Sequence, residues 1–173
     1  LPTLCLILTL LALAFLTLFK KFTFALALTS LTVLTQLALI SVRVYISGRA
    51  PITNMYETVM FSGFAALVLA MIIGHLKKEK VFLYVGLVYN ACTLMMMNFA
   101  TGMLSDNISP LVPVLRDNFW LSTHVTLIIT SYGALAMSWG LANTVIIKKS
   151  FFILSKPVVV YYGYLIYTCL KYG

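Results

Sequence analysis

Six long apolar runs alternate with short polar segments along the 173 residues of the chain. About 20 consecutive apolar residues cross the hydrocarbon core of a bilayer as an α-helix. The pattern therefore predicts about six spanning helices, at residues 3–19, 22–46, 55–75, 81–97, 119–147 and 158–170. We expect an all-α, polytopic transmembrane helical bundle in which residues 1–173 form a single transmembrane domain.

The composition agrees with a bilayer as the solvent of this chain. Hydrophobic residues make up 62% and charged residues 9%, and the mean hydropathy is +1.03. A soluble domain has ~45–50% apolar and ~25% charged residues. These values exclude an ordinary soluble protein and intrinsic disorder. Three cysteines spread over the whole length also exclude a disulfide framework.

The net charge of +8 predicts an orientation and gives no sign of nucleic-acid binding, because no basic stripe follows a polar face. Lysines and arginines in short loops stay on the cytoplasmic side. Alternating the loops places eight lysines against Glu79 on one side, which we expect to be cytoplasmic: Lys20, Lys21, Lys77, Lys78, Lys80, Lys148, Lys149 and Lys156. The amino terminus is then outside, and Lys171 is the one lysine left on the outer side.

His124 is the strongest candidate for chemistry. It lies about one turn inside the fifth run, four residues after Trp120 and therefore on the same helical face. An ionisable residue within a spanning segment is a functional candidate by default. Imidazole ligates transition metals and haem iron, and because no Cys or carboxylate stands at chelating spacing, haem is favoured over zinc. The alternative is an interfacial histidine hydrogen-bonded to a neighbouring helix.

A second candidate region precedes the third run, on the side expected to be external. Asn54 followed by Glu57 resembles a capping box at a helix start. Arg49 and Tyr56 add a guanidinium and a phenol at the same surface. Such groups can hold anionic partners, such as haem propionates, through charge-assisted hydrogen bonds.

Two motifs resemble the CcsA (ResC) family of system II cytochrome c biogenesis. They are Gly48-Arg-Ala-Pro-Ile-Thr-Asn-Met-Tyr-Glu57, and Pro110-Leu-Val-Pro-Val-Leu-Arg-Asp-Asn-Phe-Trp-Leu-Ser-Thr-His-Val125 followed by Ser131-Tyr-Gly-Ala134. The resemblance implies a haem-handling protein of a bacterial inner or thylakoid membrane, with its site on the periplasmic or lumenal side. It implies that His124 is a haem iron axial ligand and that haem b is the transported substrate. It also implies a CcsB (ResB) partner or fused half, and apocytochrome c with a Cys-x-x-Cys-His motif.

The chain departs from the family in one respect. The tryptophan-rich segment Trp-Gly-x-x-Trp-x-Trp-Asp and the second external histidine are missing from these residues, where Trp120 and Trp139 are the two tryptophans. Together with Leu1 in place of an initiator methionine, this predicts a portion of a longer CcsA-like protein or of a fused CcsBA-type synthase.

Three functions compete at this point. The first is a haem-delivery component of cytochrome c maturation, part of a haem lyase, in which Trp120 packs the macrocycle and Arg49, Tyr56 and Glu57 shape the outer mouth. The alternative is a non-catalytic helical subunit or scaffold, favoured by small residues at Gly133, Ala134, Ala136 and Gly140. A channel or transporter is disfavoured, because such pathways need charged residues at the membrane midplane.

Overall fold

Six α-helices account for nearly all of the described chain. The computed structural model describes residues 2–18, 22–48, 52, 54–77, 79–99, 118–151 and 156–172. The helices are α1 (Pro2–Leu18), α2 (Phe22–Ser47), α3 (Met55–Lys77), α4 (Lys80–Phe99), α5 (Asn118–Phe151) and α6 (Lys156–Tyr172). The six predicted runs and the all-α class are confirmed, with α5 extending four residues past its predicted end.

The helices differ in whether their length suffices to cross a bilayer. Within the described ranges, four helices are long and apolar enough: Thr23–Ser47, Met55–Lys77, Lys80–Phe99 and Thr123–Ser150. Helices α1 and α6 have 17 residues each. At 1.5 Å per residue they reach about 26 Å, slightly less than the ~30 Å hydrocarbon core. The four longer helices thus form the membrane-spanning frame.

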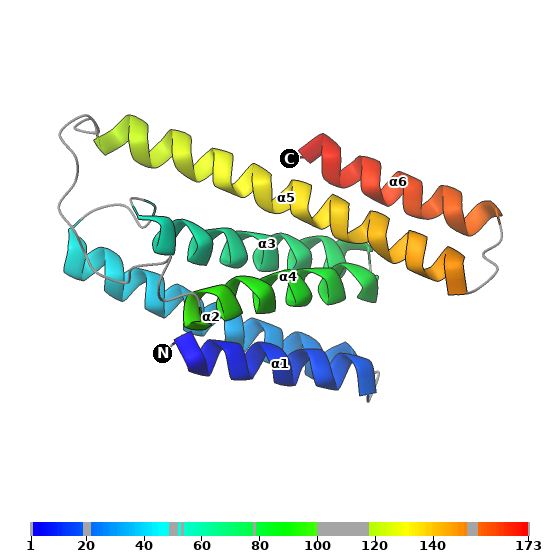
Figure 1. Ribbon diagram of the computed structural model, residues 1–173, viewed down its shortest axis with the longest axis horizontal. Helices are drawn as coiled ribbons and strands as arrows, with labels where there is room; N and C mark the ends of the chain where they lie inside the picture. The colour runs from blue at the N-terminus through cyan, green and yellow to red at the C-terminus, as the bar shows by residue number, and fades with distance from the viewer. Residues whose placement is uncertain are drawn as a thin grey trace.

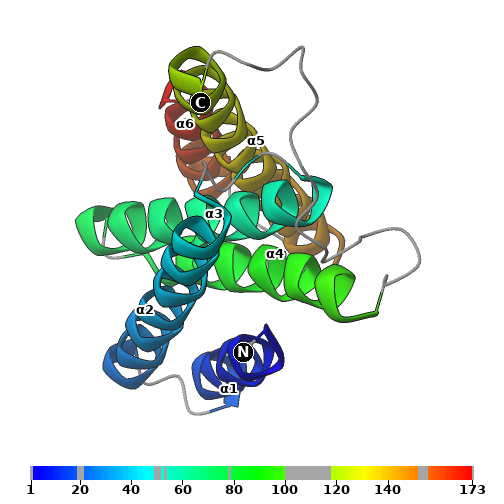
Figure 2. The same cartoon turned by 90° about the vertical axis from the view of Figure 1, so that its left-hand side faces the viewer.

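The helices stack in three layers. Helices α3 and α4 form the middle layer, with α1 and α2 on one side and α5 and α6 on the other (Figures 1 and 2). Successive helices alternate in direction, so the end of α2 and the starts of α3 and α5 lie at one end of the bundle (Figure 1). Lys77 and Lys148 lie in the last turns of α3 and α5, near the other end of the bundle.

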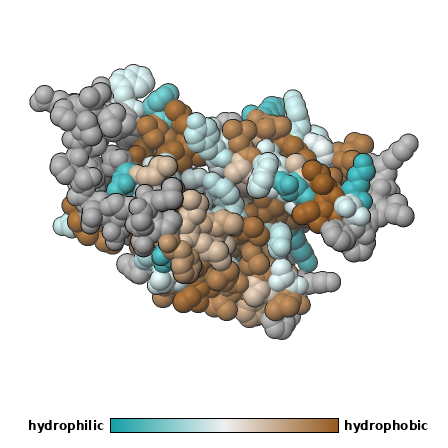
Figure 3. All heavy atoms as spheres, in the orientation of Figure 1, coloured by the Kyte–Doolittle hydropathy of each residue, from teal (hydrophilic) through white to brown (hydrophobic). Residues whose placement is uncertain are grey.

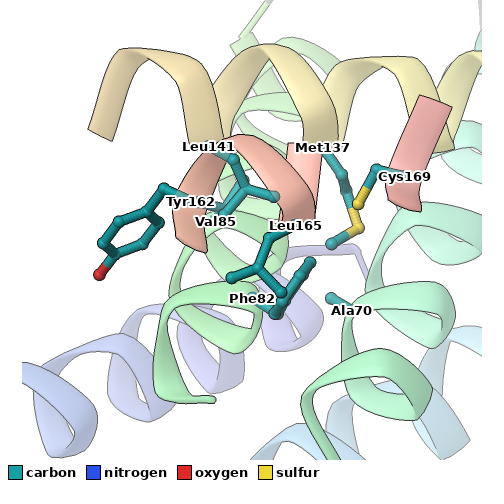
Figure 4. Packing of buried hydrophobic residues seen from close by; sticks show 8 residues of the cluster. All are labelled: Ala70, Phe82, Val85, Met137, Leu141, Tyr162, Leu165 and Cys169. Carbon is teal, nitrogen blue, oxygen red and sulfur yellow. The ribbon is translucent and has the colours of Figure 1, made fainter. Parts of the chain in front are cut away.

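Apolar side chains fill the spaces between the layers. One cluster joins the last four helices through eight buried residues (Figure 4): Ala70, Phe82, Val85, Met137, Leu141, Tyr162, Leu165 and Cys169. Large hydrophobic side chains also cover much of the outer surface (Figure 3). Leu34, Phe99 and Trp139 are 61%, 79% and 71% exposed, respectively. An apolar exterior around an apolar core is what a lipid-embedded bundle requires, because lipid tails are as apolar as leucine.

Small residues determine how closely the layers approach. A Cβ added at Gly86 of α4 would collide with the Cβ of Ala70 on α3. At Gly133 of α5, an added Cβ would lie 3.3 Å from the backbone nitrogen of Ala66 on α3. Close backbone approach at small residues is the usual means of helix association in membranes. Gly86 and Gly133 therefore fix α4 and α5 against α3.

Gly86→Ala is expected to destabilise the bundle, because the neighbouring Ala70 Cβ belongs to a short side chain that cannot rotate away. Overpacking of this kind costs about 1–3 kcal/mol. Thermal unfolding of the detergent-purified protein measures the effect. Gly163→Ala on α6 is the matched control, since its added methyl group meets open space. Equal unfolding temperatures for the two variants would contradict the proposed close contact.

Candidate functional site

The start of α3 is anchored to the end of α2 by one arginine. The Nη2 atom of Arg43 lies 3.6 Å from Oε1 of Glu57, and the two side chains are 17% and 1% exposed. The Arg43 guanidinium also stacks over the Tyr56 ring, 4.7 Å from its centroid, and Tyr56 is buried. A buried carboxylate requires such a partner, because an isolated charge away from water is strongly unfavourable. Two residues predicted from the sequence, Tyr56 and Glu57, thus both contact the Arg43 guanidinium.

The first turn of α3 is capped as the sequence predicts. The Asn54 side-chain oxygen Oδ1 accepts a hydrogen bond from the Tyr56 backbone nitrogen at 3.4 Å. The Thr58 hydroxyl donates to the Asn54 carbonyl at 2.9 Å. The first of these bonds satisfies a backbone N–H that a helix start leaves without a helical partner. The second adds to the helical bond that the Asn54 carbonyl already accepts from the Thr58 backbone nitrogen at 2.9 Å. Glu57 sits in the same turn, where the helix dipole favours a negative charge.

His124 occupies a different environment on α5. Both His124 and Trp120 are exposed, with Trp120 at 67%. The Trp120 ring meets the Phe119 ring edge to face, with centroids 6.0 Å apart. No hydrogen bond from any described residue holds the His124 imidazole. The first turns of α5 therefore present an open surface made of one imidazole and two aromatic rings.

The Arg43–Glu57 group and His124 lie at equal distances along α3 and α5 from the contact between these helices, but on opposite faces. Helices α3 and α5 run in the same direction (Figure 1), and their backbones come close together where Gly133 meets Ala66. Glu57 precedes Ala66 by nine residues and His124 precedes Gly133 by nine residues, about 13 Å in each helix. Nine residues are two and a half turns, so each side chain points away from the α3–α5 contact. Glu57 therefore faces α2, whereas His124 faces outward.

Other sequence-predicted features fall elsewhere. Arg49 and residues 100–117, which include the start of the second motif, lie outside the described residues. His75 is exposed near the lysine-bearing end of α3, where it lines an apolar groove of about 540 Å³ beside α2. No three His, Cys, Asp or Glu side chains of the described ranges gather at metal-binding distance.

Sequence reasoning did not select Arg43 as a site residue. The sequence does contain a signal for Arg43, because it is a charged residue inside an apolar run. Such residues usually face the bundle interior. It also stands seven residues after Gln36, which places the two on one face of α2. The partner across the turn, Glu57, could not be identified from spacing alone.

Comparisons with known proteins give one consistent set of relatives. The chain is similar to the cytochrome c biogenesis protein CcsA of Chlorella vulgaris, with 33% identity over 110 residues, which are 62% of this chain and 34% of the relative. For the CcsA protein of Chlamydomonas reinhardtii the identity is 37% over 92 residues, 51% of this chain and 26% of the relative. For that of Prochlorococcus marinus (strain NATL2A) it is 32% over 119 residues, 67% and 36%.

These matches span between 26% and 36% of each relative's length. No protein-family model matches the chain. No solved structure matches it either.

Asn54→Ala is expected to lower the stability of the protein by about 1 kcal/mol, because it removes the side-chain acceptor at the first turn of α3. Chemical unfolding followed by the helical signal in circular dichroism measures the loss. Asn54→Asp keeps an acceptor oxygen at the same position and serves as the control. If alanine and aspartate behave alike, the side chain at position 54 does not cap α3.

Proposed function

Because this chain belongs to the CcsA family of cytochrome c biogenesis proteins, we propose that it acts in cytochrome c maturation by binding haem and presenting it at the outer membrane face. The observation that carries the proposal is the open imidazole of His124, four residues from the exposed Trp120 on the first turns of α5. Haem b is the substrate that the chain delivers.

His124 supplies one axial bond to the haem iron. A neutral imidazole suits this role, and an axial histidine stabilises the iron and tunes its reduction potential. The exposed rings of Phe119 and Trp120 offer an apolar surface against which the edge of a macrocycle can pack. Trp120 and His124 are four residues apart and lie on one face of α5, so a single bound haem can reach both. The Phe119 ring contacts the Trp120 ring and extends this apolar surface sideways.

The other predicted haem-site residues take different roles in this proposal. Arg49 provides a positive charge for the haem propionates, as the sequence pattern suggests. Tyr56 and Glu57 contribute by fixing the start of α3, because both are buried and engaged with Arg43. This anchor joins α2 to α3, and Arg49 lies in the sequence between these two helices.

The reaction requires partners beyond this chain. A CcsB (ResB)-type partner or fused half completes the assembly, and the haem acceptor is an apocytochrome with a Cys-x-x-Cys-His motif. Its cysteine thiols form the thioether bonds, while the membrane chain positions the haem. The site faces the periplasm when the membrane is bacterial and the lumen when it is a thylakoid membrane.

The scaffold alternative rested on small residues that could bind a further helix. Gly133 and Gly140 instead pack against Ala66 and Val85 within the chain. Two of the four small residues therefore have partners inside the bundle, which weakens the support for a purely scaffolding role.

His124→Gly is expected to abolish most of the haem absorbance of the detergent-purified protein, because the variant lacks the iron-binding nitrogen. Added imidazole should restore the absorbance by occupying the space of the lost ring. His75→Gly is the matched control, since His75 is also exposed but lies near the opposite end of the bundle. The ligand assignment is wrong if haem absorbance persists in His124→Gly and free imidazole changes nothing.

The orientation can be tested independently of haem. A reporter enzyme fused after Lys149 is expected to be active on the cytoplasmic side, because the lysine-rich loops stay there. A reporter inserted between Ser105 and Pro113 is expected to be external. The reverse pattern would place His124 on the cytoplasmic side, away from the site of external cytochrome maturation.

A further inference from the structure

Two side-chain amides meet near the centre of the bundle. The Nε2 atom of Gln36 on α2 donates a hydrogen bond to Oδ1 of Asn90 on α4 at 3.0 Å. Gln36 is 1% exposed and Asn90 is 0% exposed. Asn90 stands near the middle of α4, roughly 14 Å from either end of that helix. In a lipid-embedded bundle this is the depth farthest from bulk water.

This single bond leaves half of each amide without a partner. Among the described residues, Gln36 Oε1 and Asn90 Nδ2 are buried and make no hydrogen bond. Exchanging oxygen and nitrogen in both amides would give the same balance, because one donor and one acceptor would still remain. An unpaired polar atom in an apolar interior is strongly unfavourable, so this pair requires a further partner.

The neighbouring residues pack closely against the pair on the side of α3. A Cβ at Gly63 of α3 would lie 2.9 Å from Asn90 Oδ1 and would collide with the Thr93 hydroxyl. Thr93 donates its hydroxyl proton to the Asn90 carbonyl at 2.9 Å, so it remains able to accept a hydrogen bond. Three helices thus enclose the two amides.

The chemistry of the two unpaired atoms selects the ligand. Asn90 Nδ2 is a donor and repels a bare cation, whereas Gln36 Oε1 is an acceptor and repels an anion. The charge of either ion would also remain uncompensated in the apolar interior. A side chain from another protein or a lipid headgroup cannot reach atoms that are buried inside the bundle. A neutral molecule with one donor and one acceptor, small enough for an interior site, satisfies both atoms.

We propose that the Gln36–Asn90 pair binds one structural water molecule at the centre of the bundle. The water accepts a hydrogen bond from Asn90 Nδ2 and donates one to Gln36 Oε1. It thereby joins α2 to α4 at the membrane midplane through a second bridge beside the direct amide bond. The site is separate from His124 and does not depend on the proposed role in haem delivery.

Nuclear magnetic resonance of the full chain in nanodiscs, with ¹⁵N-labelled asparagine and glutamine, tests the proposal. We expect a cross-peak between water and the Asn90 side-chain amide protons, recorded in the rotating frame, where its sign separates direct contact from proton exchange. Gln36→Met should reduce or remove this peak, because the water loses one of its two partners. A parent spectrum that resolves the Asn90 protons without a contact peak would overturn the proposal.

Asn98→Leu provides the matched control on the same helix. The Asn98 amide donates to the carbonyl of Leu94 in its own helix at 2.8 Å, so its removal should leave the Asn90 water peak unchanged. A peak that survives undiminished in folded Gln36→Met would also refute the bridge, because the water would then not depend on Gln36. The helical signal in circular dichroism verifies that each variant folds. If a variant does not fold, the spectrum of the parent protein alone still shows whether water contacts the Asn90 amide protons.

Discussion

The structure depends on one constraint, that polar groups inside a hydrocarbon environment must find partners within the protein. Helix α2 shows how the chain meets it, because its inward face carries three polar residues three or four positions apart and a fourth two turns further on. The threonine hydroxyls on this face bond to carbonyls of their own helix, and the longer side chains bond to other helices. The polar residues on this face are Thr29, Thr32, Gln36 and Arg43. The rotation of α2 about its own axis is therefore fixed by hydrogen bonds and an ion pair, as well as by apolar packing.

The helices could be predicted from the sequence because an apolar run is a local signal, whereas their layer order could not. In a lipid-embedded bundle, leucine suits both the interior and the exterior: Leu67 is fully buried and Leu34 is 61% exposed. Hydropathy therefore does not indicate which face of a helix is internal. The informative positions are the small residues, and Gly86 and Gly133 mark close approaches in the structure. A sequence alone does not identify the helix that each glycine meets.

The candidate site shows the same division between local and distant information. The i, i+4 spacing of Trp120 and His124 predicted one face, and both residues are exposed on α5. The capping role of Asn54 was also predictable, because it involves only the next few residues. The burial of Glu57 was not, since its partner Arg43 belongs to the preceding helix. The contribution of Arg49, Tyr56 and Glu57 to a haem site stays a prediction.

The position of His124 depends on packing far from its own ring. The depth of α5 relative to α3 is set where Gly133 meets Ala66, about 13 Å further along each helix. A shift of α5 by one helical turn would move the imidazole by about 5 Å, more than the length of an iron–nitrogen bond. The Arg43–Glu57 anchor in turn fixes the start of α3, the helix against which α5 is placed. A haem ligand on an open surface can thus be held at a defined depth by close helix contacts and a buried ion pair that never touch the haem.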